Sequence, residues 1–160
     1  VFLDETVRRS SYSLRATYAR TALALVRNGQ SDKAIEVLNT ASAKMPTSKL
    51  GYEYFTLGLI EAYFAAGDKK TALSTIAGFK TDIVQRLDYY GQFKGKQARQ
   101  VRSEIDANLQ YLQMLARVNL QYAQGDQGMG LTQEAYMADP TVQLYEKYAQ
   151  QFGVANQPQQ

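Results

Sequence analysis

Apolar residues recur every three or four positions along almost the whole chain, which is the spacing of one face of an α-helix. Alternating apolar and polar residues never continue far enough to predict a β-strand. The pattern therefore predicts an all-α protein with helices over about 6–28, 31–45, 49–66, 68–90, 96–124 and 140–152.

The predicted breaks coincide with residues that end or begin helices. Gly29 and Gly67 can adopt the left-handed conformation that ends a helix. Pro46 closes the second helix because proline does not continue a helical hydrogen-bond ladder. The side chains predicted to cap helix N-termini are Ser31, Ser48, Asp68 and Asp139, the last of which precedes a proline.

The helical periodicity also predicts which side chains form the core. Each helix carries one apolar stripe that is expected to face its neighbours. The stripes are Leu14, Tyr18, Ala22 and Leu25; Ala34, Leu38, Ala41 and Met45; Tyr52, Phe55, Leu59 and Tyr63; Ala72, Ile76, Ile83 and Leu87; Ile105, Leu109, Leu112, Ala116, Leu120 and Ala123; and Val142, Tyr145, Tyr148 and Phe152.

Two segments of the chain share one plan. "NGQSDKAIEVL" (28–38) and "AGDKKTALSTI" (66–76) each contain a glycine, an alanine five residues later and a branched apolar residue four residues after that. In this plan the glycine turns the chain between two helices, and the alanine allows them to approach closely. Repetition of a helix-turn-helix unit every 30 to 40 residues or so is typical of an α-solenoid.

The repeat resembles the tetratricopeptide repeat. The first unit, about 14–47, matches that family's signature at all positions but Thr21, and the second, about 52–86, is more degenerate. The resemblance implies a single helical-repeat domain over 1–153, with a long helix at about 96–124, a short capping helix at about 140–152 and a disordered tail at 154–160. The matched positions are Tyr18, Thr21, Ala22, Leu25, Ala34, Leu38, Ala41 and Pro46, then Thr56, Leu59, Ile60, Tyr63, Ala72, Ile76, Phe79 and Val84.

A narrower resemblance rests on "VFLDETVRRSSYSLR", "ARTALALVRNGQSDKAIEVLNTASAKMP", "YEYFTLGLIEAYFAAGDKKTALSTI" and "RLDYYGQF". These stretches look like the soluble C-terminal region of bacterial multi-pass membrane proteins that resemble protein O-mannosyltransferases. The resemblance implies a location at the extramembrane face of the inner membrane; we expect the periplasmic side and leave the cytoplasmic side open. The chain has no apolar run of the roughly 18 residues needed to cross a bilayer, so we expect no direct membrane insertion.

Composition limits the chemistry. The chain has no cysteine and no histidine, which removes thiol nucleophiles, the usual serine triads and the commonest zinc ligand. Glu53 and Glu61 lie about 12 Å apart along a helix, beyond the roughly 6.5–9.5 Å of an inverting glycosidase. "GDQGMG" (125–130) lacks the lysine of a phosphate loop and is interpreted as a linker. We therefore predict no enzyme activity, no catalytic residue, no cofactor and no metal site.

The charge of the chain gives no sign of a nucleic-acid partner. The net charge of +3 is small and dispersed, so none is expected. The densest basic group, formed by Arg8, Arg9, Arg15 and Arg20, is interpreted as a solvated helix face, with a patch for phosphate or anionic lipid as the alternative.

A partner groove is predicted along the first helix of each repeat unit, as is usual for tetratricopeptide arrays. It is expected to be apolar and aromatic, and to hold either the chain's own C-terminal helices or an amphipathic helix of a protein or peptide partner. The predicted groove residues are Ala19, Arg20, Leu23, Tyr54, Leu57, Glu61 and Phe64.

The favoured function is a non-catalytic protein-interaction or scaffolding module, with the membrane part of the same full-length chain as one candidate partner. The alternative is a free-standing helical-repeat module that binds a glycan or a peptide. Twelve tyrosines offer rings that stack on sugars, although half-buried tyrosines are also common in helical proteins.

Overall fold

The computed structural model describes residues 5–123 and 133–154. Side chains are described for residues 10–122 and 133–154. The helical prediction is confirmed, because the described residues contain α-helices and no strand. The chain divides into two compact units, 1–76 and 77–160, and the boundary falls inside one helix. The predicted linker at 125–130 and the tail beyond residue 154 lie outside the described residues.

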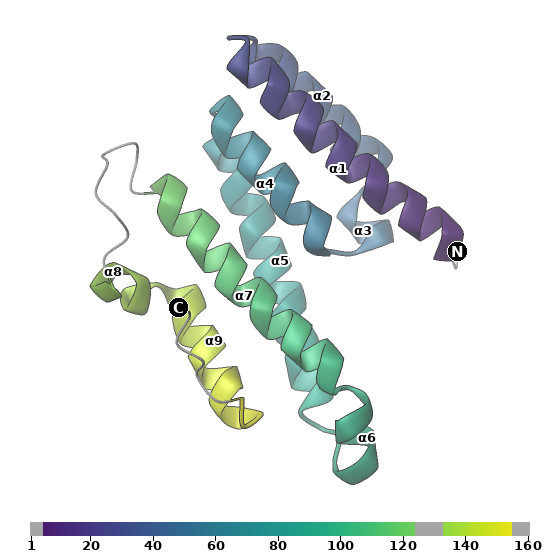
Figure 1. Ribbon diagram of the computed structural model, residues 1–160, viewed down its shortest axis with the longest axis vertical. Helices are drawn as coiled ribbons and strands as arrows, with labels where there is room; N and C mark the ends of the chain where they lie inside the picture. Colours follow the sequence, from purple (N-terminus) through teal and green to yellow (C-terminus); the bar gives the residue numbers. More distant parts are fainter. Residues whose placement is uncertain (1–4, 124–132, 155–160) are drawn as a thin grey trace. The chain divides into compact units, whose positions relative to one another are not determined.

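The first unit contains α1 (Glu5–Arg27), α2 (Ser31–Lys44), α3 (Thr47–Leu50), α4 (Tyr54–Ala66) and the beginning of α5 (Lys69–Tyr90). Helices α1 and α2 form an antiparallel hairpin, and α4 packs along α1 and also reaches α2 (Figure 1). The centre of this unit's core is made of apolar residues with no exposed surface, namely Ala22, Ala34, Leu38, Ile60, Ala62 and Ala72.

Both predicted glycine turns are confirmed. Gly29 and Gly67 have φ angles of +72° and +92°, the left-handed conformation that favours glycine. The amide of the residue after each glycine donates to a carbonyl five residues earlier: Gln30 N to Leu25 O at 2.9 Å and Asp68 N to Tyr63 O at 3.0 Å. This is the Schellman arrangement, which satisfies carbonyls that the helix end leaves open.

Three predictions of local structure in this unit are wrong. Ser31 is the first residue of α2, and its predecessor Gln30 occupies the N-cap position without a side-chain hydrogen bond. The helix predicted over 49–66 is interrupted at Gly51, whose φ of +76° ends α3. Glu53, not Ser48, caps α4 by accepting from Phe55 N at 2.7 Å.

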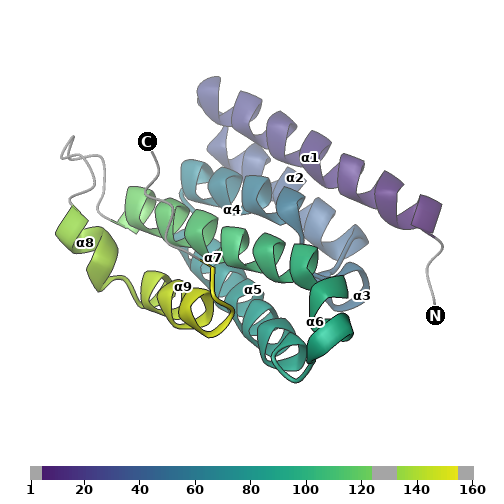
Figure 2. The same ribbon diagram turned by 60° about the horizontal axis from the view of Figure 1, so that its bottom comes forward.

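The second unit contains the rest of α5, then α6 (Gly95–Gln100), α7 (Arg102–Ala123), α8 (Gln133–Ala138) and α9 (Pro140–Gln151). Helix α7 pairs with α9, and α8 contacts both (Figure 2). The single long helix predicted over 96–124 is interrupted at Val101, and α8 was not predicted. The predicted cap of α9 is confirmed, because Asp139 accepts from Thr141 N at 2.7 Å.

The second unit is held together by apolar stripes and a few polar contacts between helices. The predicted stripe of α7 is buried from Ile105 to Leu120. The rings of Phe79 on α5 and Tyr111 on α7 lie 5.4 Å apart. Tyr148 on α9 donates from its hydroxyl to Asp88 on α5 at 2.6 Å. Burial and this short hydrogen bond raise the pKa of Tyr148 to about 12.

The buried face of α1 differs from the predicted one. Leu14, expected to point inward, is 50% exposed, whereas Arg15, Ala19 and Ala22 are buried. The shift has a packing cause: α1 contacts both α2 and α4, so its buried surface is turned toward the gap between them. No helix in the described part of the chain combines the length and apolar character that crossing a bilayer requires.

Candidate functional site

The predicted groove lies where α1 and α4 cross closely. Ala19 on α1 is buried, and a Cβ built on Gly58 of α4 would lie 3.5 Å from the Cβ of Ala19. Two small residues therefore form the contact between these helices. The side chains around this contact determine the shape and charge of the surface that a partner could reach.

The seven predicted groove residues fall into two groups. Ala19, Leu57 and Phe64 are buried and present no apolar surface. Arg20 is exposed, Leu23 and Glu61 are half-buried, and Tyr54 is 56% exposed.

Helix spacing distributes the accessible members along the two helices around the contact between Ala19 and Gly58. Tyr54 and Glu61 flank Gly58 at steps of four and three, so they share the side of α4 that meets Ala19. Leu23 lies one turn beyond Ala19 on α1, and Arg20 lies beside it. We call Arg20, Leu23, Tyr54 and Glu61 the α1/α4 face.

The α1/α4 face carries an aromatic ring, an aliphatic side chain and two charged groups of opposite sign. Partial burial raises the pKa of Glu61, because a carboxylate loses solvation next to the helix surface. A cationic group placed beside Glu61 would stabilise its charged form. The face therefore suits a segment that presents both apolar and charged side chains.

Arg15, interpreted from the sequence as part of a solvated basic group, is instead buried, with 1% of its surface exposed. Its guanidinium donates from Nη1 to Glu53 Oε1 at 2.9 Å and to the Gly51 carbonyl at 3.0 Å. Its Nη2 donates to the Met45 carbonyl at 2.9 Å. Arg15 thus joins α1 to the end of α2 and to the loop that caps α4.

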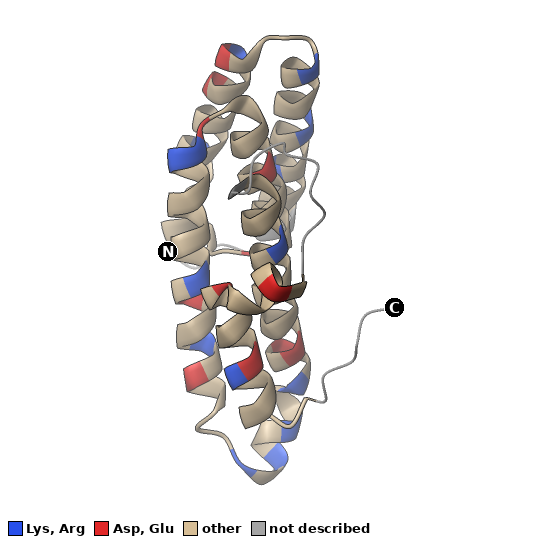
Figure 3. Ribbon diagram, turned by 90° about the vertical axis from the view of Figure 1, so that its left-hand side faces the viewer, with Lys and Arg blue, Asp and Glu red and all other residues tan. Residues whose placement is uncertain are grey.

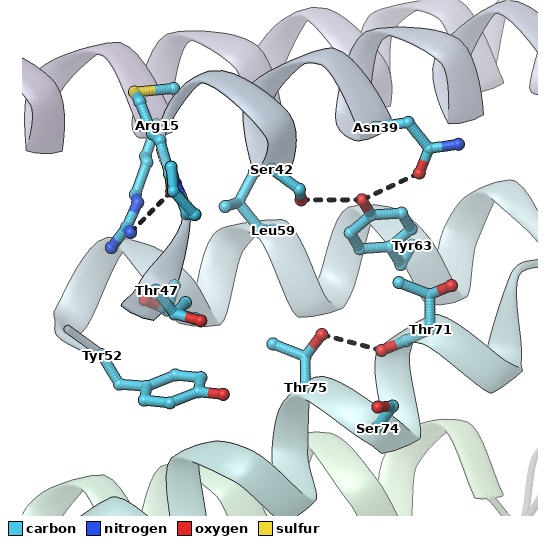
Figure 4. A pocket seen from close by; sticks show the side chains of 13 residues that line it. Arg15, Asn39, Ser42, Thr47, Tyr52, Leu59, Tyr63, Thr71, Ser74 and Thr75 are labelled. Carbon is cyan, nitrogen blue, oxygen red and sulfur yellow. Dashed lines mark hydrogen bonds between the residues drawn. The ribbon is translucent and has the colours of Figure 1, made fainter. Parts of the chain in front are cut away.

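A pocket of about 350 Å³ opens between α2, the loop containing α3, α4 and the first turns of α5 (Figure 4). This volume is within the range of small-molecule sites. Met45, Pro46 and Leu59 supply apolar lining, and Tyr52 lies across from Ser42 and Tyr63 in this view. The remaining lining is rich in groups that donate and accept hydrogen bonds: Asn39, Ser42, Thr47, Thr56, Tyr63, Thr71, Ser74 and Thr75.

The Tyr63 hydroxyl organises one wall of the pocket. It lies 3.0 Å from Ser42 Oγ and donates to Asn39 Oδ1 at 3.2 Å (Figure 4). Burial is the main cause that raises the pKa of Tyr63, so the phenol is neutral at physiological pH. On the α5 side, Thr75 donates from Oγ1 to the Thr71 carbonyl at 2.8 Å.

The pocket is close to neutral overall. Its one charged lining residue is Arg15, whose charge is matched by Glu53. The described residues contain no group of three or more carboxylates that could hold a metal ion. The arrangement can hold a neutral ligand that exchanges hydrogen bonds.

Sequence reasoning missed this pocket. Tyr63 was predicted as a core residue, and its periodicity gave no sign of the hydroxyl partners on α2, which are 21 and 24 positions away in the chain. The burial of Arg15 could have been suspected from the sequence, because Arg15 lies four residues before Ala19 and therefore on the same side of the helix. Comparison with protein-family models, with curated proteins and with solved structures finds no match for the chain.

Proposed function

We propose that this chain is a non-catalytic protein-interaction module built from tetratricopeptide-like helical hairpins. In this proposal it is the extramembrane domain of a bacterial membrane protein that resembles glycosyltransferases, on the periplasmic side of the inner membrane. The resemblance of the sequence supports this parentage, and the α1/α4 face supports the interaction role.

The single observation that carries the interaction role is the exposure of Tyr54 on the α1/α4 face. A tyrosine that exposes more than half of its surface offers an anchor for a partner's apolar residues. Arg20 on α1 and Glu61 on α4 add charges of opposite sign to this face. This combination fits an amphipathic helix that carries an acidic and a basic side chain beside its apolar stripe.

The membrane-embedded part of the same full-length polypeptide is the proposed source of that helix. A domain tethered to its partner needs only modest intrinsic affinity, because the linker keeps the local concentration high. A modest surface such as the α1/α4 face is sufficient for this task.

Single-cysteine labelling tests the proposal, since the chain has no cysteine of its own. A fluorophore on Tyr54→Cys should respond when the membrane part is added in detergent. The same fluorophore on Thr40→Cys, at an exposed position of α2, should not respond. Arg20→Glu should weaken binding, measured through the same label at position 54.

Two results would contradict the proposal. Equal responses from the labels at positions 54 and 40, or no response from either, would show that the α1/α4 face is not the contact. A full-length reading frame without a multi-span hydrophobic segment would remove the proposed parentage.

The pocket supports a second candidate function, the binding of a neutral glycan. Sugars are recognised by hydroxyl and amide groups combined with aromatic rings, and Asn39, Ser42, Tyr52 and Tyr63 supply these groups. Saturation-transfer NMR with methyl mannoside, glucose and galactose tests this function. Signal that is lost in Ser42→Ala but kept in Thr81→Ala, a residue that does not line the pocket, would support it. No transfer with any of the sugars would exclude it.

A further inference from the structure

The corner between α5 and α7 carries a short run of positive charge, with Asp88 and Glu104 just outside its two ends. Residues 89–103 contain Lys94, Lys96, Arg99 and Arg102 and no acidic residue. These four positive charges exceed the net charge of the whole chain, which is +3. The charges of the remaining residues therefore sum to −1, and both basic and acidic positions occur elsewhere in the described chain (Figure 3).

Three of these cations are exposed and available. In the part of the chain that the structure describes, no ion pair involves Lys94, Lys96 or Arg99, and all three side chains are exposed. Arg102 differs, because its Nε donates to Asp106 at 3.1 Å and its Nη1 donates to the Phe152 carbonyl at 3.0 Å. The available charge is thus concentrated on the loop after α5 and on α6.

Aromatic rings accompany these cations. Tyr89 is 56% exposed at the end of α5, and its ring meets that of Phe93 edge-to-face at 5.0 Å. The Tyr90 ring lies 6.5 Å from Phe93. Phe93 directly precedes Lys94, so rings and ammonium groups share one short corner of the chain.

From this arrangement we propose that the α5–α6 corner docks peripherally on an anionic lipid bilayer. We define the docking corner as Tyr89, Phe93, Lys94, Lys96 and Arg99. Tyrosine rings favour the headgroup level of a bilayer, and lysine and arginine extend toward lipid phosphates from the same level. Each basic residue near an anionic surface adds electrostatic attraction.

A bilayer fits this corner better than other anionic partners do. Nucleic acid binds along basic stripes or grooves, and the helices that follow the corner carry both signs of charge (Figure 3). A bilayer needs only a local patch, because it presents a continuous anionic surface to it. The inference deepens the proposed location beside a membrane, but it does not depend on the α1/α4 face.

Flotation with vesicles tests the docking corner. The chain should bind vesicles of phosphatidylcholine mixed with phosphatidylglycerol and should bind pure phosphatidylcholine only weakly. Lys94→Ala/Lys96→Ala/Arg99→Ala should reduce the partition coefficient by about ten- to a hundredfold, because three basic residues lose their attraction to the surface. Tyr89→Ala should also weaken binding, and its effect should persist at high salt.

A matched control removes the same charge elsewhere. Lys33, Lys69 and Lys70 are exposed and lie outside the corner. Their triple alanine variant should keep most of the binding if position matters and net charge does not. Circular dichroism establishes that each variant is folded.

Three outcomes would overturn the inference: equal loss in both triple variants, binding that does not depend on anionic lipid, and tighter capture by an oligonucleotide or polyglutamate than by vesicles. A failure of the labelling experiment at Tyr54 would leave the vesicle result intact, and the reverse also holds.

Discussion

The ion pair between Arg15 and Glu53 gives the sharpest prediction about stability. Replacing Glu53 with alanine removes the carboxylate that lies 2.9 Å from the Arg15 guanidinium and leaves a charge with 1% exposure unmatched. The same change removes the acceptor that caps α4 at Phe55 N. Both effects act in the loop that joins the two hairpins of the first unit.

The size of the loss follows from these contacts. Breaking a buried ion pair costs about 3–5 kcal/mol. Arg15 keeps its bonds to the Gly51 and Met45 carbonyls, which favours the lower end of that range. Loss of the cap adds about 1 kcal/mol. We therefore expect Glu53→Ala to lower the free energy of unfolding by about 4 kcal/mol in total.

Two further variants separate the causes. Glu53→Gln keeps an oxygen for the Phe55 amide and removes the charge, so its cost should be smaller than that of alanine by roughly the value of the cap, about 1 kcal/mol. Asp106→Ala removes an exposed partner of Arg102, with side-chain exposures of 52% and 47%, and should cost at most about 0.5 kcal/mol.

Urea unfolding followed by circular dichroism and tyrosine fluorescence measures these differences. If Glu53→Ala cost no more than Asp106→Ala, the reasoning about the buried charge would be refuted. If the glutamine variant lost as much as the alanine variant, the assigned role of the cap would be wrong.

Three other predictions concern individual side chains. Leu57→Asp should unfold the first unit rather than merely weaken a partner contact, because Leu57 is buried and burying a carboxylate costs free energy. The far-ultraviolet circular dichroism signal at moderate urea measures this unfolding. Tyr148→Phe should remove the bond to Asp88 and cost about 1.5–3 kcal/mol. The pKa of Tyr148 is raised to about 12, so in the wild type the stability that this bond contributes is complete below about pH 10 and is lost as the pH rises toward 12. Urea titrations across this range should show that the variant loses less stability at alkaline pH than the wild type does. Gly58→Ala should raise the melting temperature, because its Cβ meets only an ordinary contact and alanine favours the helix by about 1 kcal/mol, whereas Gly67→Ala should lower it because φ is +92°.

The burial of Leu57 also changes how the α1/α4 face should be tested. A substitution at a buried groove residue confounds loss of binding with loss of folding. Tyr54 and Arg20 are exposed, so changes at these two positions perturb the surface and leave the core intact. The labelling experiment and the Arg20→Glu variant are designed on this basis.

The sequence by itself determined most of the helical plan. Local rules were sufficient where one residue controls one turn: Gly29 and Gly67 end their helices, and Asp139 caps α9 before Pro140. Periodicity was sufficient where the three-four spacing continues without a break, as it does from Ile105 to Leu120. Both kinds of signal act over a few residues, so the chain carries them without reference to its tertiary fold.

The tertiary structure decided what depends on distant partners. Glu53 caps α4 in a loop held by Arg15, 38 positions earlier, and this contact accompanies the break at Gly51 that periodicity did not predict. The same kind of contact decided the site. Whether Leu57 is buried and Tyr54 exposed depends on which helices pack against α4, and the pocket around Tyr63 exists only because α2 brings Ser42 and Asn39 to it. Helical spacing assigns a side chain to a face, but only packing determines whether that face is covered.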